Sequence, residues 1–408
     1  MPNGPLTGIR VIDMTRVVAG PLAGQTLGDL GADVVKIERP GAGDDSRAVG
    51  PPWTKDAEGH DSSTATYYQC LNRNKRSVTL DFAHPKGGDI LREMVKGADV
   101  LIENYRAGTL ARYGLGYDDL KKINKSLVYC SITGFGQNGP YAGRSGYDYL
   151  IQAMGGVMSM TGPPEGAPGG EPTRVGAPIA DILTGMNAVI GILAALKHRD
   201  VAGEGQHIDI ALLDSQVAAL LNPFVAWLNN REEIPRTGNY HPTAAPYGPF
   251  PTSDGRILIA TFNDREFTRL AHAVERPQWL EDPRFGSLGL RVQNRDALAS
   301  ELAAVLQSGT KAHWIERLNQ HKVSCGPINT MADIEREPQV HARNMIISLP
   351  HPDLGEIRLA GSPLRLSATP VSYRRTPPAV GQDTDDVLRD WLGLDHRALS
   401  DLKNERVV

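Results

Sequence analysis

One carboxylate, Asp181, stands alone in an apolar stretch: it is the only charged residue between Arg174 and Lys197. Pro178 precedes it and suits the first turn of a helix, where a missing N–H does no harm. Apolar residues then fall on nearly every helical face, which predicts a buried helix. The first turn of such a helix has unpaired backbone N–H groups. Asp181 is therefore either a nucleophile or proton acceptor at the edge of a core, or a residue that caps the helix and complements its dipole.

The segments around this helix alternate between strand-like and helix-like patterns. Strands are predicted over residues 9–13, 34–37, 100–103, 127–132 and 207–211, and helices over 21–30, 87–96 and 118–123. Two strands separated by one helix indicate a right-handed βαβ unit with a parallel strand pair. The repetition predicts the α/β class, with a large open parallel sheet of the Rossmann-like kind and ligands beyond the carboxyl ends of its strands.

Irregular segments predict two domains. The Pro-rich stretch 231–251 is the best candidate for an interdomain connection, and Cys325-Gly-Pro327 breaks the chain again. We expect residues 1–224 to begin the large α/β domain, residues 225–325 to form a smaller α+β domain, and residues 326–408 to return to the large one. The tail has a strand pattern over 356–360 and a final helix over 385–392.

Composition limits the classes of partner. The chain has 408 residues, 22% of them charged, a formal net charge of −4 and no long run of like charge, so neither nucleic acid nor a membrane is an expected partner. Three distant cysteines without a CxxC pair or clustered histidines predict no metal site and a reducing, cytoplasmic location. The amino terminus has no signal-peptide pattern.

A dinucleotide site is disfavoured, although a βαβ unit opens the chain. The turn over residues 15–24 has no GxGxxG, and Pro21 stands where a glycine would let the pyrophosphate approach. Glu38 ends the second predicted strand like a ribose-binding acid, but one acid without the glycines is a weak signal.

Seven ordered motifs indicate a different family. They are Asp13–Pro21, Lys36–Asp44, Asn72–Ser77, Glu103–Tyr105, Gly134–Pro140, Gly146–Asp148 and the helix of Asp181. In this order and spacing they resemble the family III CoA-transferases, from about Leu6 to the final helix. The resemblance implies that Asp181 is a nucleophile that attacks an acyl-CoA thioester, with coenzyme A as a substrate and carrier and no permanently bound cofactor. Such a nucleophile must be ionised and free of a tight Arg or Lys partner.

The resemblance also implies the coenzyme A contacts. By position these are Val18, Ala19, Arg39, Leu80, Asn104, Tyr105 and Arg112, with Ser145, Gly146 and Tyr147 closer to the thioester. Taken singly, Arg39 and Arg112 could also be surface charges, and Tyr105 could be core. Lys75 and Arg76 could be solvated or could touch phosphate. Gly155–Gly156 and Gly134–Gly139 are candidate oxyanion donors.

Position 147 separates two chemistries. The α-methylacyl-CoA racemases resemble this chain too, but they have a histidine where this chain has Tyr147. An ordinary tyrosine, with a pKa of about 10, is a poor base at neutral pH. Transfer is therefore favoured over racemisation.

The substrate and the assembly are expectations from the resemblance. The stretch 236–247 is similar to that of succinyl-CoA:dicarboxylate transferases of the glutarate type, and it lacks the glycine run of the formyl-CoA:oxalate enzymes. Arg236 or His241 could neutralise the remote carboxylate of a C4–C5 diacid, or the stretch could be a purely structural loop. Succinyl-CoA is the expected donor, and two chains are expected to interlock in a homodimer.

Overall fold

The computed structural model describes residues 4–56, 58–352 and 354–408. Contacts divide the chain into two compact units. The first contains residues 1–155, 176–220 and 338–408, and the second contains residues 156–175 and 221–337. The expected domain ranges, 1–224 with 326–408 and 225–325, stay a prediction.

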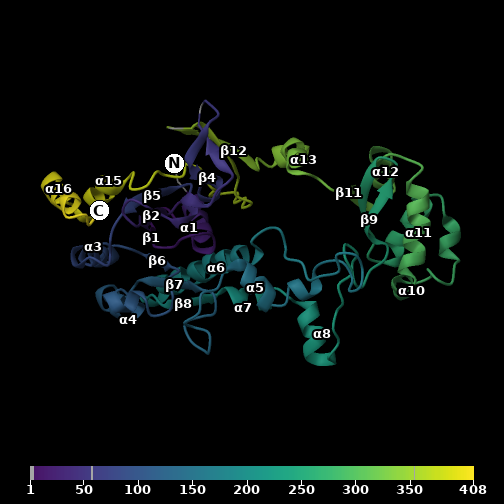
Figure 1. Ribbon diagram of the computed structural model, residues 1–408, viewed down its shortest axis with the longest axis horizontal. Coiled ribbons are helices and arrows are strands. Elements are labelled where there is room, and N and C mark those ends of the chain that lie inside the picture. The colour runs from purple at the N-terminus through teal and green to yellow at the C-terminus, as the bar shows by residue number, and fades with distance from the viewer. Residues whose placement is uncertain (1–3, 57, 353) are drawn as a thin grey trace. The chain divides into compact units, whose positions relative to one another are not determined.

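A six-stranded parallel sheet forms the centre of the first unit (Figure 1). Its order is β5-β2-β1-β6-β7-β8, with bounds Lys75–Thr79, Asp33–Glu38, Arg10–Asp13, Val100–Glu103, Val128–Thr133 and His207–Ala211. Neighbouring pairs such as Ile12 with Val35 and with Leu101 set the register. The predicted α/β class with an open parallel sheet is confirmed.

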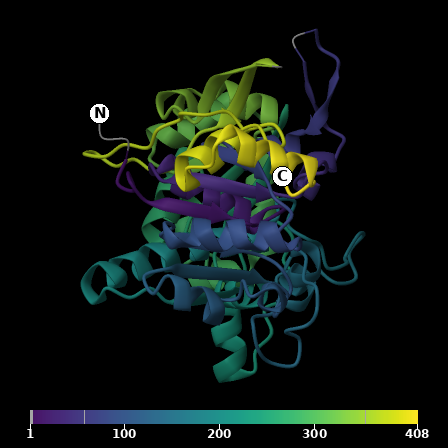
Figure 2. The same ribbon diagram turned by 90° about the vertical axis from the view of Figure 1, so that its left-hand side faces the viewer.

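Helices cover both faces of this sheet. One core packs α1 (Ala19–Asp29), α5 (Asp148–Met154), α6 (Ile179–Ala202) and α7 (Leu212–Ala218) against the sheet. The other packs α3 (Pro85–Lys96), α4 (Tyr117–Ile123), α15 (Thr384–Leu392) and α16 (His396–Asn404) against the opposite face. Figure 2 looks onto this second face, with the yellow C-terminal helices in front of the purple strands. The last segment of the chain thus completes the domain that the first segment begins.

Smaller elements complete the first unit. They are the hairpins β3 (Trp53–Lys55) with β4 (Asp61–Ala65) and β12 (Ile346–His351) with β13 (Gly355–Ala360), together with α2 (Thr66–Gln69) and α14 (Pro338–Ala342). Both hairpins are antiparallel, as their short connections require.

The segment around Lys75 and Arg76 corrects an expectation, since it is a sheet strand and not a solvated or phosphate-binding pair. Lys75 is fully buried, and its Nζ donates to Asp13 Oδ2 at 2.9 Å. Arg76 pairs with Asp33 at 2.5 Å and with Asp390 at 3.1 Å. Both cations are neutralised inside the fold, which is the condition under which charges are buried.

Helix α6 differs from the buried helix that its composition predicts. Its Ala188 and Ile192 are fully buried, but Met186 is 56% exposed and Ile190 is 63% exposed. By length and composition alone α6 could cross a membrane, and 44% of its most apolar stretch is buried inside the protein. The helix therefore has one face in the core and one apolar face without a covering element among the described residues.

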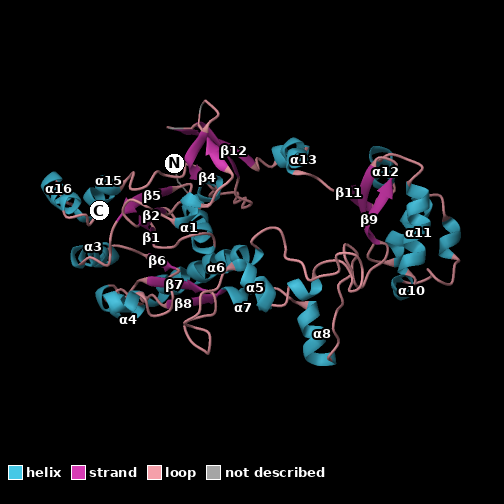
Figure 3. Cartoon of the chain, viewed as in Figure 1, coloured by secondary structure: helices cyan, strands magenta, loops and turns pink. Residues whose placement is uncertain are grey.

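The second unit is α+β. It has an antiparallel sheet of order β11-β10-β9, with bounds Ser324–Pro327, Gly255–Ala260 and Tyr247–Thr252. Its helices are α8 (Asn222–Asn230), α9 (Asp264–Ala273), α10 (Leu288–Gln293), α11 (Arg295–Leu306), α12 (Lys311–Gln320) and α13 (Met331–Arg336). Phe250, Phe267 and Trp279 are in its core. Figure 3 shows this sheet beside its helices.

Candidate active site

A cavity of about 250 Å³ lies where the strands of the parallel sheet end. It is lined by residues that follow β1, β6 and β7, as expected for an open α/β sheet. Eight of the predicted site residues line it: Val18, Ala19, Asn104, Tyr105, Ser145, Gly146, Tyr147 and Asp181. The fold thus gathers residues that are up to 163 positions apart in the sequence, counted from Val18 to Asp181.

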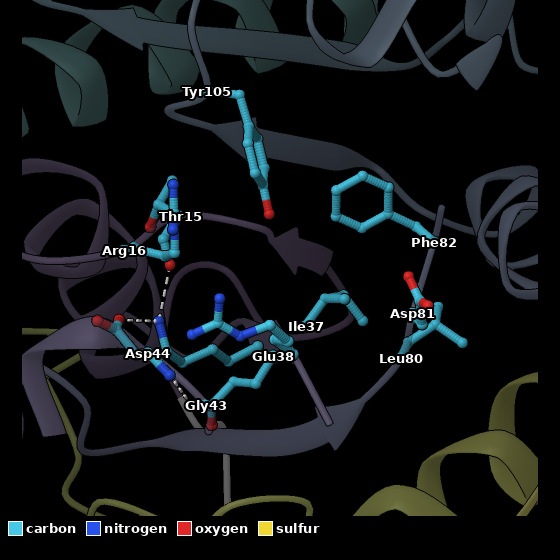
Figure 4. Close-up of a pocket in the computed structure, with 12 residues that line it drawn as sticks. Thr15, Arg16, Ile37, Glu38, Gly43, Asp44, Leu80, Asp81, Phe82 and Tyr105 are labelled. Atoms are coloured by element: carbon cyan, nitrogen blue, oxygen red, sulfur yellow. Dashed lines mark hydrogen bonds and ion pairs between the residues drawn. The ribbon is translucent and has the colours of Figure 1, made fainter. Parts of the chain in front are cut away.

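A second cavity of about 180 Å³ has Arg39, Leu80 and Tyr105 in its wall (Figure 4). Arg16 and Tyr105 line both cavities, so the two adjoin. Arg39 is largely exposed and lies 3.6 Å from Asp45. Together the cavities run from the exposed Arg39 to the apolar helix that holds Asp181.

Three predicted residues lie outside these cavity walls. Arg112 is exposed in the short turn Leu110–Tyr113. Arg236, in the second unit, donates to the carbonyl oxygens of Pro163 at 3.1 Å and Gly170 at 2.9 Å, and so holds the Gly/Pro-rich loop. The ring of His241 stacks on Tyr247, with 4.8 Å between centroids. A substrate role for Arg236 or His241 stays a prediction.

The helix of Asp181 is capped by another residue. Pro178 is the N-cap position of α6 and makes no side-chain cap. Instead Asp148, at the start of α5, accepts hydrogen bonds through Oδ1 from the backbone N–H groups of Ala180 at 2.8 Å and Asp181 at 3.3 Å. Its Oδ2 accepts from Gln152 Nε2 at 2.6 Å. Asp148 rather than Asp181 therefore caps this helix. Asp181 lies in the first turn, where its charge complements the helix dipole, and its carboxylate makes no cap hydrogen bond.

The electrostatic setting of Asp181 is unusual for a carboxylate. Burial raises its pKa to about 7, and the negative charge of Asp148 adds to the rise. Among the residues that the structure describes, no Lys or Arg forms an ion pair with Asp181. A carboxyl group with a pKa near neutrality in a cavity is a common feature of functional sites.

The first turn of α1 borders the same cavity. Val18 is the N-cap residue of α1, and no described side chain caps this end. Gly185, one turn after Asp181, packs against α1 so closely that an added Cβ would lie 2.6 Å from the Ala19 carbonyl oxygen. Asp181 and the open N–H end of α1 thus line one wall, because residues four apart share a helix face.

The glycines proposed as oxyanion donors differ in whether they line the cavity of Asp181. Gly134 lines the cavity. The Gly155 N–H already donates to the Ile151 carbonyl at 2.7 Å, and the Gly136 N–H donates to Thr133 Oγ1 at 2.8 Å. Of these glycines, only Gly134 lines the cavity of Asp181.

Sequence reasoning missed several residues of this region. Arg16, Arg106 and Arg144 line the Asp181 cavity, and Tyr67 has its pKa raised by burial and then by the charge of Asp181. The Gly-Tyr-Asp motif did contain Asp148, but the Ala180 N–H that it accepts lies 32 positions away in the sequence.

Glu38 is used inside the fold, where its Oε1 accepts hydrogen bonds from Arg47 at 2.7 Å and from Ser77 at 2.6 Å. It is therefore unavailable to a ribose.

Comparisons with known proteins identify the family of the chain. Residues 6–384 match the model of CoA-transferase family III. The chain is 42% identical to the succinate–glutarate CoA-transferase of Agrobacterium fabrum, over 96% of this chain and 97% of that one. It is 38% identical to the succinyl-CoA:glutarate CoA-transferase of Homo sapiens, over 99% of this chain and 90% of that one.

A solved structure agrees as well. The crystal structure of a CAIB/BAIF family protein from Brucella suis superposes with a TM-score of 0.84 at 41% identity, covering 95% of this chain and all of that one. The chain therefore belongs to CoA-transferase family III and is a CoA-transferase.

Proposed function

We propose that this enzyme moves coenzyme A from succinyl-CoA to a C4–C5 dicarboxylic acid, with Asp181 as the covalent nucleophile. This proposal rests on a partly buried carboxylate that has no ion-pair partner among the described residues, in a cavity at the carboxyl ends of the parallel strands. The substrates are suggested by the named activities of the Agrobacterium and human relatives, which act on succinate or succinyl-CoA and glutarate.

The proposed reaction has four steps. An Asp181 oxygen attacks the thioester carbonyl of succinyl-CoA, the C–S bond breaks, and the products are an aspartyl–succinyl anhydride and the CoA thiolate. The thiolate attacks the aspartyl carbonyl and releases succinate, which leaves an aspartyl-CoA thioester. The acceptor carboxylate displaces the thiolate and forms a new anhydride. The thiolate then attacks the acceptor acyl carbonyl, which yields the new acyl-CoA and free Asp181. Together the four steps divide one difficult exchange into several easier ones.

Each addition to a carbonyl develops a negative charge on oxygen, and we assign its stabilisation to the start of α1. Val18 and Ala19 line the cavity of Asp181, and no described side chain caps this helix end. The N–H groups and the positive end of the helix dipole favour an anion there. Gly134 is a second candidate donor.

Coenzyme A would extend from this point along the two adjoining cavities. Arg39, Leu80, Asn104, Tyr105 and Arg112 remain the proposed contacts for its nucleotide end, and Ser145, Gly146 and Tyr147 for its thioester end. Arg16 and Arg106 add positive charge, which suits a ligand with three phosphates.

Racemisation is the weaker alternative. It would need a base opposite Asp181, and Tyr147, which stands at the racemase histidine position, is 70% exposed. Incubation in deuterated water separates the two, since a racemase introduces deuterium at the α-carbon and transfer does not require it.

We also propose that the enzyme is a cytoplasmic homodimer. The exposed apolar face of α6, with Met186 and Ile190, and that of α8, with Val225 and Leu228, favour burial against a second copy. A monomeric mass in dilute native solution would contradict the dimer, and recovery with a membrane or secreted fraction would contradict the location.

The substrate proposal is tested by incubating the enzyme with labelled succinyl-CoA and a panel of free acids. We expect C4–C5 diacids such as glutarate to be converted to their CoA esters faster than monocarboxylic acids of equal length. Equal conversion of the matched monoacid would contradict the role of the second carboxylate, and preferred conversion of oxalate would favour the formyl-CoA:oxalate class.

A further inference from the structure

The connection between β1 and α1 has a strained backbone at Val17. Its φ is +73°, in the left-handed region that β-branched residues rarely adopt. Strain of this kind persists only where surrounding contacts hold it, and it gathers at functional sites. The next two residues, Val18 and Ala19, line the cavity of Asp181.

A buried ion pair is hydrogen-bonded to the backbone of this connection; Figure 4 shows Asp44 beside Thr15 and Arg16. Lys36 Nζ lies 2.7 Å from Asp44 Oδ2, and both side chains are fully buried. Asp44 Oδ1 accepts a hydrogen bond from the Val17 N–H at 3.2 Å. Lys36 Nζ donates to the Thr15 carbonyl at 2.8 Å. The two halves of one ion pair therefore bind residues on either side of Arg16.

The side chain of Asn104 also binds the backbone of this connection. Its Oδ1 accepts from the Arg16 N–H at 3.0 Å, and its Nδ2 donates to the Arg16 carbonyl at 2.7 Å. Three consecutive residues are thus fixed by buried or half-buried side chains.

The geometry points to the Lys36–Asp44 pair as a positioning device for the transfer reaction. We propose that it holds Val17 in its left-handed conformation and so aims the first N–H groups of α1 at the acyl group on Asp181. This inference rests on the proposed function. The pair does not touch the reacting atoms, so both residues are positioning residues.

The pair stays charged inside the protein. Burial opposes ionisation, but the charge of Lys36 holds the pKa of Asp44 well below its ordinary value. Likewise, burial opposes the charge of Lys36, but Asp44 and Asp13 raise its pKa. A charged acceptor holds the Val17 N–H more firmly than a neutral one.

A positioning role and a purely stabilising role differ in how they depend on residue 17. Glycine adopts a positive φ without strain, so it needs no clamp. If the pair acts through Val17, then Val17→Gly should restore activity to a variant that has lost the Asp44 carboxylate. A pair that only stabilises the fold would give no such rescue.

The test uses the full-length enzyme and the acylation rate at saturating succinyl-CoA, so that weaker ligand binding does not contribute. Asp44→Ala should slow acylation by about 100-fold, the effect of a misplacement of roughly 1 Å. The double variant Val17→Gly, Asp44→Ala should recover most of that loss. Ser46→Ala is the matched control, because it removes another donor to Asp44 Oδ1 and should keep a rate near that of the wild type. Equal rates for Asp44→Ala and Ser46→Ala, or no recovery in the double variant, would overturn the inference.

A second pair of variants covers the case in which Asp44→Ala fails to fold. Lys36→Met with Asp44→Asn removes both charges but keeps an oxygen for the Val17 N–H, whereas Lys36→Met with Asp44→Leu removes that acceptor. We expect the Leu version to acylate more slowly, and equal rates would overturn the inference. Asp181→Asn separates the two proposals: if it keeps normal transfer, the nucleophile assignment fails, whatever the Asp44 variants do.

Discussion

Asp148 accepts the backbone N–H of Asp181 at 3.3 Å, so one carboxylate caps the helix that presents the other. This relationship has two consequences. It fixes the first turn of α6, and it places a negative charge near Asp181 that adds to burial in raising its pKa to about 7. A carboxyl group that must be ionised to attack a thioester is thus poised to titrate near neutral pH.

The transfer rate should therefore depend on pH. We expect kcat/KM to rise as the pH increases through about 7, because Asp181 becomes the nucleophilic carboxylate as it loses its proton. Asp148→Asn keeps an oxygen for the Ala180 N–H but removes the charge, so it should move the inflection to lower pH. Asp200→Asn, which removes a largely exposed charge from the same helix, is the control and should leave the profile in place. An unchanged or higher inflection in Asp148→Asn would contradict this account.

The same pKa predicts a gain in stability from removal of the nucleophile. The pKa of Asp181 is higher in the folded than in the unfolded chain, so its contribution to stability is present at low pH and is lost as the pH rises from about 4 to about 7. Asp181→Asn should therefore be more stable than the wild type at pH 8, by about 1–2 kcal/mol after allowance for solvent screening. The two proteins should be equally stable near pH 4. Denaturant unfolding at both pH values measures the stability, and a destabilised variant at pH 8 would count against a partly buried carboxylate without an ion-pair partner.

Much of the fold could be predicted, because β-branched runs separated by amphipathic helices determine a parallel sheet. Strand β5 could not, since Lys75 and Arg76 look like surface charges until their partners are known. Those partners, Asp13 and Asp33, lie 62 and 43 positions away. Burial of a charge depends on such distant neighbours, which local patterns do not contain.

The candidate site, like the fold, could be predicted from the sequence only in part. Asp181 stands out in the sequence because it is alone in an apolar stretch, and its neighbours in the cavity were named from the resemblance. The positive φ of Val17 and the Lys36–Asp44 pair cannot be recognised from a local sequence pattern. Asp44, which holds the Val17 N–H, lies 27 positions away in the sequence. The exposed face of α6 was missed for a related reason, as an apolar residue looks the same whether it packs in its own core or against another chain.

That exposed face allows a test of the proposed dimer. Ile190→Glu places a charge at the centre of the apolar surface of α6, where the wild-type side chain is 63% exposed. If a second copy covers this face, the buried charge should keep chains that are refolded from denaturant from assembling into the interlocked dimer, while the monomer fold remains because the side chain faces outward. Size-exclusion chromatography with light scattering measures the mass of the refolded protein. Lys122→Glu, at an exposed position of α4, is the control and should leave the mass unchanged; a dimer that survives Ile190→Glu would exclude this face as the interface.

The most direct test of the central claim is to trap the acyl-enzyme. The wild type is incubated with succinyl-CoA, treated with hydroxylamine or borohydride, digested and analysed by mass spectrometry, with Asp181→Asn as the control. We expect the modification at Asp181 in the wild type, no modification of this peptide in the variant, and a fall in transfer of several orders of magnitude. The variant should still bind coenzyme A. Near-normal transfer by Asp181→Asn, together with a label on another residue or none, would contradict the assignment of Asp181 as the nucleophile.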